Sequence, residues 1–254
     1  MDNKKILPIN ELYSCLQGEG KFSGVPHLLI RFSGCPLRCQ FSTTDFCDTP
    51  YSSWSPEKGK ITIKDIQILA EKYKQIRHVM ITGGSPTSHP ETLEYLCRFF
   101  RYSNYFITIE TEGSAFVKTD AQFISLSPKL RSSRPRVGSI VPQSNKKVTS
   151  RDLILHEKNR SNFTSMKKLL TQHADYQVKF VVSNFENFDY EMEEIKFIER
   201  ELEIPREKIY LMPAGATKKE LDLRRDSVIS LCISEGFNYT DRLHIVAFDN
   251  LRGV

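Results

Sequence analysis

Short apolar runs alternate along the chain with longer segments in which apolar residues recur every three or four positions. The runs predict strands at 27–33, 78–82, 105–111, 123–127, 176–183, 208–213 and 243–248. The longer segments predict amphipathic helices at 63–75, 90–102, 163–173, 187–202 and 217–236. This alternation is typical of an α/β fold, in which crossover helices connect parallel strands. Because the strands are nearly continuously apolar, we expect the sheet to be covered on both faces or closed as a barrel core.

One stretch interrupts this alternation. Residues 131–160 contain eight Lys or Arg residues against two acidic residues, and they show no clear period. A structureless insertion of this length is usually either a functional loop or a mobile one. We interpret this basic loop insertion as a solvated, flexible excursion rather than a binding arm. No linker separates it from the rest, so we expect a single domain over residues 1–254.

Composition indicates an ordinary globular protein. The 254 residues are 39% hydrophobic and 26% charged, and the net charge is +5. This mild charge fits an anionic ligand or a weak nucleic-acid preference, but a solvated surface explains it equally well, and we expect no direct nucleic-acid binding. No apolar run reaches membrane-spanning length, and the first ten residues lack the apolar core of a signal peptide. We therefore expect a cytoplasmic protein.

Three of the six cysteines lie close together. In a reducing compartment a disulfide framework is not expected, and Cys97 and Cys232 lie in helical segments as buried thiols would. Cys35, Cys39 and Cys47 instead follow the first predicted strand within thirteen residues. Three thiolates on one loop can bind three irons of a cubane cluster and leave the fourth iron open to a chelating cofactor. A zinc site is the alternative, although such sites usually recruit a fourth Cys or His at short spacing.

The context of these cysteines resembles a known family. The matching stretches are LQGEG (16–20), GVPHLLIRFSGCPLRC (24–39), CDT (47–49), ITGGSP (81–86), SLSPK (125–129), YLMPAG (210–215) and LHIVAFDNLRGV (243–254). In this order they resemble the 7-carboxy-7-deazaguanine synthases, which are radical S-adenosylmethionine (SAM) enzymes. The resemblance runs from residue 7 to the last residue of the chain. It implies a partial or modified parallel (β/α) barrel of the radical SAM type.

The resemblance also implies a reaction. A lyase of this family uses a 4Fe–4S cluster, SAM and Mg²⁺ to convert 6-carboxy-5,6,7,8-tetrahydropterin to 7-carboxy-7-deazaguanine with release of ammonia. The product enters deazapurine biosynthesis of the queuosine or archaeosine type. The implied partners are the pterin substrate, an electron donor such as flavodoxin or ferredoxin, and a second copy of the chain in a homodimer. No membrane partner is implied.

Individual residues take roles from the matching motifs. Cys35, Cys39 and Cys47 would ligate the cluster, and the hydroxyl of Thr49 would ligate Mg²⁺. The residues implied to contact SAM are Phe46, Cys47, Asp48, Gly84, Ser127, Lys129 and Met212. Those implied to contact substrate are Leu16, Gln17, Gly18, Glu19, Arg31, Thr82 and Val254, the last through its terminal carboxylate. No side chain is expected to be a catalytic group, because the cluster and SAM carry the chemistry.

The residues themselves support this placement. Most of them lie at or just beyond the carboxyl end of a predicted strand, where parallel barrels and open α/β sheets bind ligands. Arg31 alternates with Ile30 and Phe32, so its guanidinium faces away from them and could clamp a carboxylate. Glu19 could accept hydrogen bonds from the amidine edge of a pterin. The structural alternatives are a solvated arginine and a glutamate in a surface turn.

Three features depart from the family pattern. The usual C-x3-C-x2-C spacing is lengthened, because seven residues separate Cys39 from Cys47. The usual GGEP reads GGSP, so Ser85 replaces a carboxylate that would pair with the ammonium group of SAM. Charge-assisted hydrogen bonds are about twice as strong as neutral ones, so we expect weaker SAM binding, and we expect Ser85→Glu to tighten it or leave it unchanged. Ala214 and the FDN stretch (248–250) are departures of unknown consequence.

Two other functions compete with this interpretation. One is a glycyl-radical activase of the same superfamily, which the LQGEG and RGV stretches disfavour. The other is a degenerate homologue without catalytic activity, which would explain Ser85 and the long cluster loop. Retention of all three cysteines, Arg31, Thr49 and the SPK stretch (127–129) argues against the second alternative.

Overall fold

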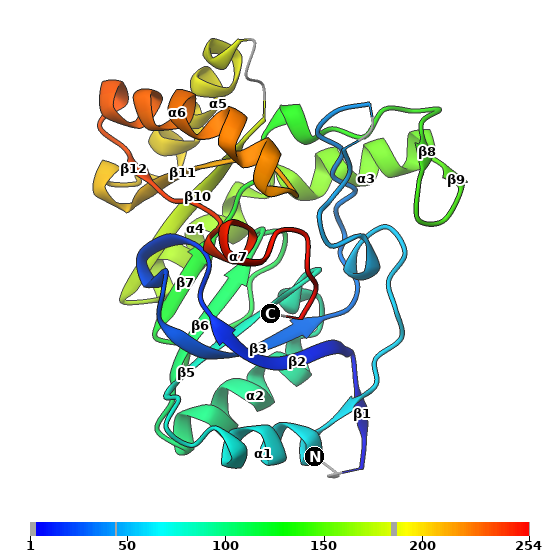
Figure 1. Cartoon of the computed structure of the whole chain (residues 1–254), viewed down its shortest axis with the longest axis vertical. Coiled ribbons are helices and arrows are strands. Elements are labelled where there is room, and N and C mark those ends of the chain that lie inside the picture. The colour runs from blue at the N-terminus through cyan, green and yellow to red at the C-terminus, as the bar shows by residue number, and fades with distance from the viewer. Residues whose placement is uncertain (1–3, 44, 184–186, 254) are drawn as a thin grey trace.

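An eight-stranded sheet forms the centre of the computed structural model, which describes residues 4–43, 45–183 and 187–253 (Figure 1). Its strands are β2 (Ile9–Leu16), β3 (Pro26–Phe32), β5 (His78–Gly83), β6 (Phe106–Thr111), β7 (Phe123–Leu126), β10 (Asp175–Val182), β11 (Ile209–Pro213) and β12 (Asn238–Tyr239). The order across the sheet is β12-β11-β10-β7-β6-β5-β3-β2. Every neighbouring pair is parallel except β2–β3, which is antiparallel.

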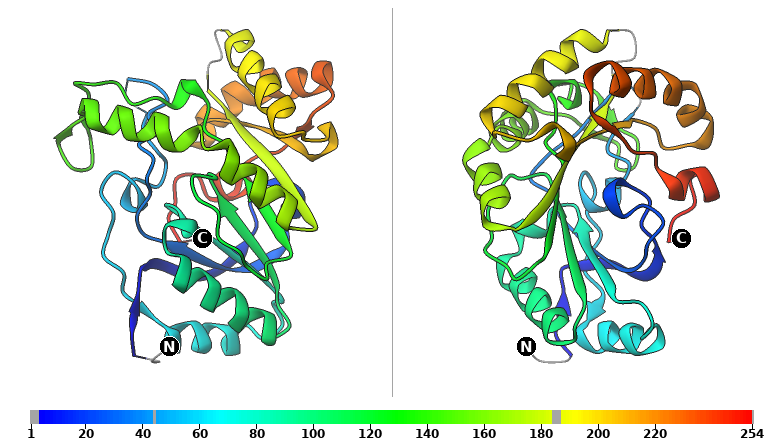
Figure 2. Two further views of the ribbon diagram at one scale, coloured as in Figure 1. Left: turned by 180° about the vertical axis from the view of Figure 1, so that it is seen from behind. Right: turned by 90° about the vertical axis from the view of Figure 1, so that its left-hand side faces the viewer.

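Most of the helices cover the convex face of this sheet, whereas the last one, α7 (Leu243–Phe248), lies by the loop after β2 (Figure 2). The others are α1 (Ile63–Lys72), α2 (Pro90–Tyr102), α3 (Ser150–Arg160), α4 (Phe163–Gln172), α5 (Phe188–Glu201) and α6 (Lys218–Glu235). Seen along the sheet, the strands curve and most of the helices lie along the outside of the curve (Figure 2). From β3 to β12 the strands follow chain order, and β2 and β12 end the sheet without pairing with each other. The fold is therefore a partial parallel (β/α) barrel, which confirms the expected fold class.

Short elements complete the fold. The small strands are β1 (Ile6–Leu7), β4 (Ile61–Thr62), β8 (Ile140–Val141) and β9 (Lys146–Lys147). The 3-10 helices are η1 (Gly20–Phe22), η2 (Pro50–Ser52), η3 (Pro86–Ser88), η4 (Arg131–Ser133) and η5 (Arg206–Lys208). None of the described helices is both long enough and apolar enough to cross a membrane.

The two faces of the sheet differ in chemistry because successive side chains of a strand point to opposite sides. On the convex side, fully buried residues pack against the helices; examples are Ile30, Ile81, Ile109, Ile124 and Val178. Their neighbours on the concave side are polar: Arg31, Thr82, Glu110, Ser125, Gln177 and Lys179. The concave face is therefore the one able to bind a polar ligand.

The predicted helices and six of the seven predicted strands are confirmed, but the strand at 243–248 is wrong. These residues form α7, and the strand at the edge of the sheet is β12. The six-residue apolar run is short enough to fit either a strand or one and a half turns of helix. The backbone N–H of Leu243 donates to the carbonyl of Gly18 at 2.8 Å, which ties α7 to the loop after β2.

The expectation of a structureless insertion at 131–160 is also wrong. This stretch contains η4, the β8–β9 hairpin and the eleven-residue helix α3. Thr149 and Asp152 cap the start of α3 with reciprocal hydrogen bonds. The residues that α3 buries are His156 and Arg160, which are polar. A helix whose buried face is polar has no apolar period, so the sequence pattern did not reveal it.

Candidate active site at the carboxyl ends of the strands

The three clustered cysteines lie on the loop that follows β3, at the carboxyl end of the sheet. The seven residues between Cys39 and Cys47 do not push the two cysteines apart, because part of this segment folds back on itself. Gln40 and Phe46 form an antiparallel bridge, and the N–H of Cys47 donates to the carbonyl of Cys39 at 3.1 Å. The lengthened spacing therefore leaves Cys39 and Cys47 as neighbours.

Burial affects the chemistry of all three thiols. It raises the pKa of Cys35 and Cys47 above the ordinary value, and it raises the pKa of Cys39 to about 12. Iron binding would therefore have to displace the protons, as it does at thiolate sites generally. All six cysteines are free, and Cys97 and Cys232 are buried as predicted.

The donor set fits a cubane cluster. In the described part of the chain, no group of three His, Cys, Asp or Glu side chains converges on one metal ion. A cubane makes no such demand, because each thiolate binds a different iron. Three thiols on one loop, none of them in a disulfide, suit that arrangement.

The 131–160 insertion packs directly on the cysteine loop. The N–H of Gln40 donates to the carbonyl of Ser133 at 2.9 Å, and the Gln40 side-chain oxygen accepts from the N–H of Arg136 at 2.8 Å. On the other side, Nδ1 of His156 accepts the N–H of Arg38 at 3.1 Å. Val141 and Val148 of the insertion also form a small apolar cluster with Phe46, which lies on the loop, and Trp54. The insertion therefore supports the loop.

The GGSP turn after β5 lies against the same loop. The N–H of Gly84 donates to the carbonyl of Phe32, and the N–H of Ser85 donates to the carbonyl of Gly34 at 2.8 Å. A Cβ on Gly84 would lie 2.2 Å from the Gly34 carbonyl oxygen and 2.3 Å from that of Ser52. Only glycine fits there, because the neighbouring atoms are backbone and cannot move aside.

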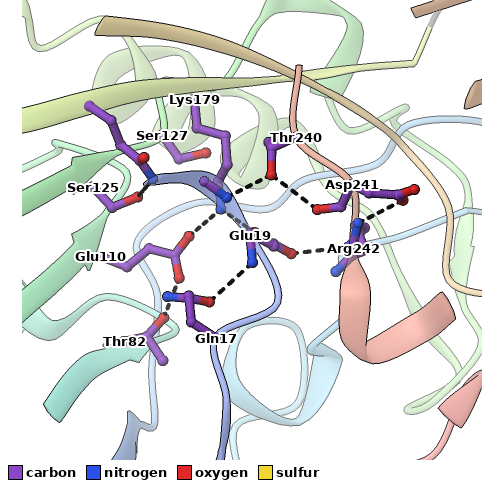
Figure 3. A network of polar contacts seen from close by, with 12 residues as sticks. Gln17, Glu19, Thr82, Glu110, Ser125, Ser127, Lys179, Thr240, Asp241 and Arg242 are labelled. Carbon is purple, nitrogen blue, oxygen red and sulfur yellow. Dashed lines mark hydrogen bonds and ion pairs between the residues drawn. The ribbon is translucent and has the colours of Figure 1, made fainter. Parts of the chain in front are cut away.

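A buried ionic network occupies the concave face (Figure 3). Lys179, which is 2% exposed, forms ion pairs with Glu19 and, at 2.5 Å, with Glu110. Glu110 also accepts a hydrogen bond from Thr82 at 3.1 Å. Arg242 pairs with Glu19 at 3.1 Å and with Asp48. The loop after β2, the cysteine loop and the segment before α7 therefore meet at one set of charges.

The charges in this network keep each other ionised. Burial alone would raise the pKa of Glu19, but Lys179 and Arg242 hold it below its ordinary value. Burial likewise opposes ionisation of Asp48, and Arg242 holds the pKa of Asp48 low. In turn, Glu110 and Glu19 raise the pKa of Lys179 despite its burial. Glu19, Asp48 and Lys179 are therefore charged at neutral pH.

Arg31 lies on the concave face, as its alternation with Ile30 and Phe32 predicted. It is opposite Thr82 on β5, and its Nε donates to Glu11 at 2.5 Å across the β2–β3 pair. Glu11 also binds Arg252 at 2.5 Å. The segment before the last residue is thereby held beside Arg31. Val254 itself lies outside the described residues.

The remaining predicted residues lie around this centre, with one exception. Gln17 donates to Met80, and its side-chain oxygen accepts the N–H of Glu19 at 3.2 Å. Thr49 lies 3.5 Å from Cys47 (Oγ1 to Sγ), and Lys129 donates to Ser127 at 2.7 Å. Leu16, by contrast, is 50% exposed at the end of β2 and lies outside the network.

Register and packing place two further predicted residues. Lys179 pairs with Tyr210 and Val181 pairs with Met212, so Met212 shares the concave face with Lys179. A Cβ on Gly18 would lie 2.0 Å from Nδ1 of His244, so the small residue allows the imidazole to pack there.

The sequence interpretation missed five polar residues of this site: Glu110, Glu112, Lys179, Arg242 and His244. Lys179 carried a usable signal, because a lysine within a buried apolar strand needs a partner. Arg242 and His244 were obscured because the adjacent segment was interpreted as a strand. Burial lowers the pKa of His244, which favours the neutral imidazole.

Comparisons with known proteins agree with this geometry. Residues 29–125 match the sequence profile of the radical SAM superfamily. The chain is 37% identical to a 7-carboxy-7-deazaguanine synthase of Rhodopirellula baltica, over 97% of this chain and 88% of that protein. It is 35% identical to the synthase of Halobacterium salinarum, over 96% and 91%. The crystal structure of QueE from Escherichia coli has a similar fold, with a TM-score of 0.58, 23% identity, and coverage of 93% and 94%.

Proposed function

The chain belongs to the 7-carboxy-7-deazaguanine synthase family of radical SAM enzymes, and we propose that it carries out the reaction named by its relatives. That reaction converts 6-carboxy-5,6,7,8-tetrahydropterin to 7-carboxy-7-deazaguanine with release of ammonia. It is a lyase step of deazapurine biosynthesis. The 4Fe–4S cluster and SAM, when bound, supply the 5'-deoxyadenosyl radical that takes hydrogen from the substrate.

One observation carries the proposal. The guanidinium of Arg242 pairs both with Asp48, which follows the cluster cysteine Cys47, and with Glu19 of the LQGEG loop. The proposed cofactor site and the proposed substrate site are therefore within the reach of a single side chain. Hydrogen transfer between bound groups requires such proximity, because the reacting atoms must be about 3–3.5 Å apart.

The chain's own residues would position the two ligands. We assign cluster ligation to Cys35, Cys39 and Cys47, and SAM contacts to Phe46, Cys47, Asp48, Gly84, Ser127, Lys129 and Met212. Substrate contacts fall to Gln17, Gly18, Glu19, Arg31 and Thr82, with Leu16 and Val254 retained from the family pattern. Glu19, ionised by its neighbours, can accept hydrogen bonds from the pterin amidine. Arg31 can bind the substrate carboxylate in a fork geometry.

Magnesium is part of the proposal through Thr49. Its hydroxyl lies beside Cys47 and next to Asp48, so a hard cation there would meet oxygen atoms. Thr49→Val should lower activity and its dependence on Mg²⁺, whereas Thr49→Ser, which keeps the hydroxyl, should retain both. Equal activity of the two variants would remove Thr49 from this role.

We propose that the electron donor is an acidic protein of the flavodoxin or ferredoxin kind, and that it docks on the 131–160 insertion. Lys146 and Lys147 are exposed on the β8–β9 hairpin and take part in none of the ion pairs between described residues. The exposed apolar side chains of Val137 and Ile140 lie in the same segment. Since the insertion contacts Gln40, next to Cys39, a donor bound there would be close to the cluster.

The deciding experiment is turnover. Anaerobically reconstituted protein with SAM, reductant and 6-carboxytetrahydropterin should form 7-carboxy-7-deazaguanine, and Cys39→Ala should form none. Cleavage of SAM without the deazaguanine product would favour a glycyl-radical activase, and no SAM cleavage at all would favour a degenerate homologue. Native mass measurement of the same sample tests the homodimer that the family implies.

A further inference from the structure

Glu112, directly after β6, is a buried carboxylate without a cation. It is 5% exposed, and its oxygens accept hydrogen bonds from three hydroxyl groups. Ser85 donates at 2.8 Å and Thr111 at 3.4 Å, and Ser114 is the third donor. Within the described ranges, no Lys, Arg or His nitrogen lies within 4.0 Å of its carboxylate.

The other glutamates of the site are paired differently. Glu11 meets Arg31 and Arg252, Glu19 meets Lys179 and Arg242, and Glu110 meets Lys179. An ionised carboxylate removed from water without a counter-charge is strongly disfavoured. Three hydroxyl donors reduce this penalty but supply no positive charge. Glu112 therefore occupies a position that a cationic ligand would complete.

The location of Glu112 indicates which ligand this is. Glu112 follows the last residue of β6, and its carboxylate accepts the hydroxyl of Ser85, which follows the end of the neighbouring strand β5. Ser85 belongs to the GGSP turn, whose backbone is bound to Gly34 beside Cys35. A cofactor bound at the open iron would therefore have its chelating end near Glu112.

We propose that Glu112 binds the ammonium group of the methionine moiety of SAM and supplies the carboxylate that position 85 lacks. The assignment rests on the proposed function. Ser85 has two parts in it: its small side chain leaves room for Glu112, and its hydroxyl orients the carboxylate. The carboxylate has moved from one strand end to the neighbouring one, β6 instead of β5.

This arrangement reverses the expectation for Ser85→Glu. Ser85 is 0% exposed and its hydroxyl lies 2.8 Å from Glu112, so a glutamate at position 85 would bring a second carboxylate into the same closed space. Like charges that close disfavour joint ionisation, and the larger side chain would strain the packing. We therefore expect Ser85→Glu alone to weaken SAM binding.

The test measures ligand affinity instead of turnover. Equilibrium dialysis of the reconstituted protein would compare SAM with 5'-methylthioadenosine, which lacks the aminoacyl group. Glu112→Gln should weaken SAM binding about 10- to 100-fold, as expected for the loss of a hydrogen bond to a charged group, and should leave 5'-methylthioadenosine binding unchanged. The surface variant Glu203→Gln is the control and should match the parent protein for both ligands.

The second part of the test moves the carboxylate from position 112 to position 85. The double variant Ser85→Glu/Glu112→Gln restores one carboxylate at the other strand end, and it should bind SAM within about threefold of the parent. The EPR spectrum of its reduced cluster should change on SAM addition as in the parent. Unchanged SAM affinity in Glu112→Gln, or a double variant as weak as Glu112→Gln, would overturn the assignment.

If Glu112→Gln alone fails to take up the cluster, the double variant still tests the assignment. Recovery of cluster and SAM binding in the double variant then supports the assignment, and no recovery contradicts it. The two proposals fail separately. Parent protein that binds SAM but forms no deazaguanine would refute the reaction and leave the role of Glu112 intact.

Discussion

Lys179 and Glu19 are separated by 160 positions in the chain and form a buried ion pair on the concave face of the sheet. Lys179 comes from the middle of β10, whereas Glu19 belongs to the loop after β2. The pair joins the loop after β2, the strand at one edge of the sheet, to β10, the third strand from the other edge, across the space where a substrate would lie. It also holds Glu19 ionised and oriented before any ligand arrives.

Removal of Lys179 tests how much this pair stabilises the fold. Lys179→Met leaves Glu19 and Glu110 facing each other without their shared cation, and we expect the free energy of unfolding to fall by about 3–5 kcal/mol. Because the pKa of Lys179 is raised, its contribution persists at neutral pH and is lost only as pH rises through that raised value. The control is Lys208→Met. Lys208 pairs with Asp175 in a partly exposed position, so this variant should lose less than about 1 kcal/mol of unfolding free energy. Urea unfolding measures both losses, and an equal loss of unfolding free energy in Lys179→Met and Lys208→Met would contradict the prediction.

The cysteine assignment predicts an all-or-none result. Alanine at Cys35, Cys39 or Cys47 should abolish the visible absorption of the 4Fe–4S cluster and SAM cleavage together. Cys15→Ala is the matched control and should keep both, because Cys15 lies on β2 opposite His27. A full cluster in Cys47→Ala would show that another residue provides the third ligand.

Arg31 separates substrate recognition from cofactor chemistry. Arg31→Ala should lower product formation about 10- to 100-fold, since the substrate carboxylate loses a charged hydrogen-bond partner. The fold should survive, because Glu11 keeps Arg252 and the Tyr51 hydroxyl as partners. Cluster content and slow SAM cleavage without substrate should remain as in the parent. Arg31→Lys, which keeps the charge but loses the fork, should be intermediate, and an unchanged KM in both variants would refute the role.

The buried His27 should account for part of the stability that the folded protein loses in acid. Burial lowers its pKa to about 4, whereas the unfolded chain takes up the proton near pH 6.5. Between these values protonation favours the unfolded state, so stability falls as pH falls from about 6.5 towards 4. From pH 7 to pH 5 this group should remove about 2 kcal/mol. Urea unfolding at the two pH values should give a smaller difference for His27→Gln than for the parent, and an identical difference would exclude His27 as a source.

The proposed donor surface predicts a defect that depends on the reductant. Reversing both charges, Lys146→Glu with Lys147→Glu, should slow cluster reduction by reduced flavodoxin several-fold at low salt and leave reduction by dithionite unchanged. The control reverses Lys64 and Lys74, which are exposed near the ends of α1 at the opposite end of the molecule (Figure 1). The same charge reversal could instead abolish binding to nucleic acid and leave reduction by flavodoxin normal. That result would assign the surface to a different partner.

Local patterns in the chain explain why much of the site could be predicted. The cysteine triplet, the GGSP turn and the position of Arg31 are each written in fewer than twenty consecutive residues. The strands and most helices follow from apolar periodicity, which burial on the convex face imposes. The prediction fails where apolar periodicity does not report burial. The helix α3 buries the polar residues His156 and Arg160, and α7 is too short for its period to be distinguished from that of a strand.

The sequence by itself determined the α/β alternation with its parallel sheet, the cysteine loop and the edge of the sheet where the proposed site lies, because these depend on residue type and short-range order. Tertiary structure alone decided which charges meet. Arg242 reaches Glu19 from 223 positions away, and the Cys39–Cys47 segment closes through a bridge that its length does not reveal. It also decided that Ser85 lies against Glu112, from the neighbouring strand end. Coulombic and hydrogen-bonding partners are set by distance in space, and for residues far apart in a chain only the packed fold defines that distance.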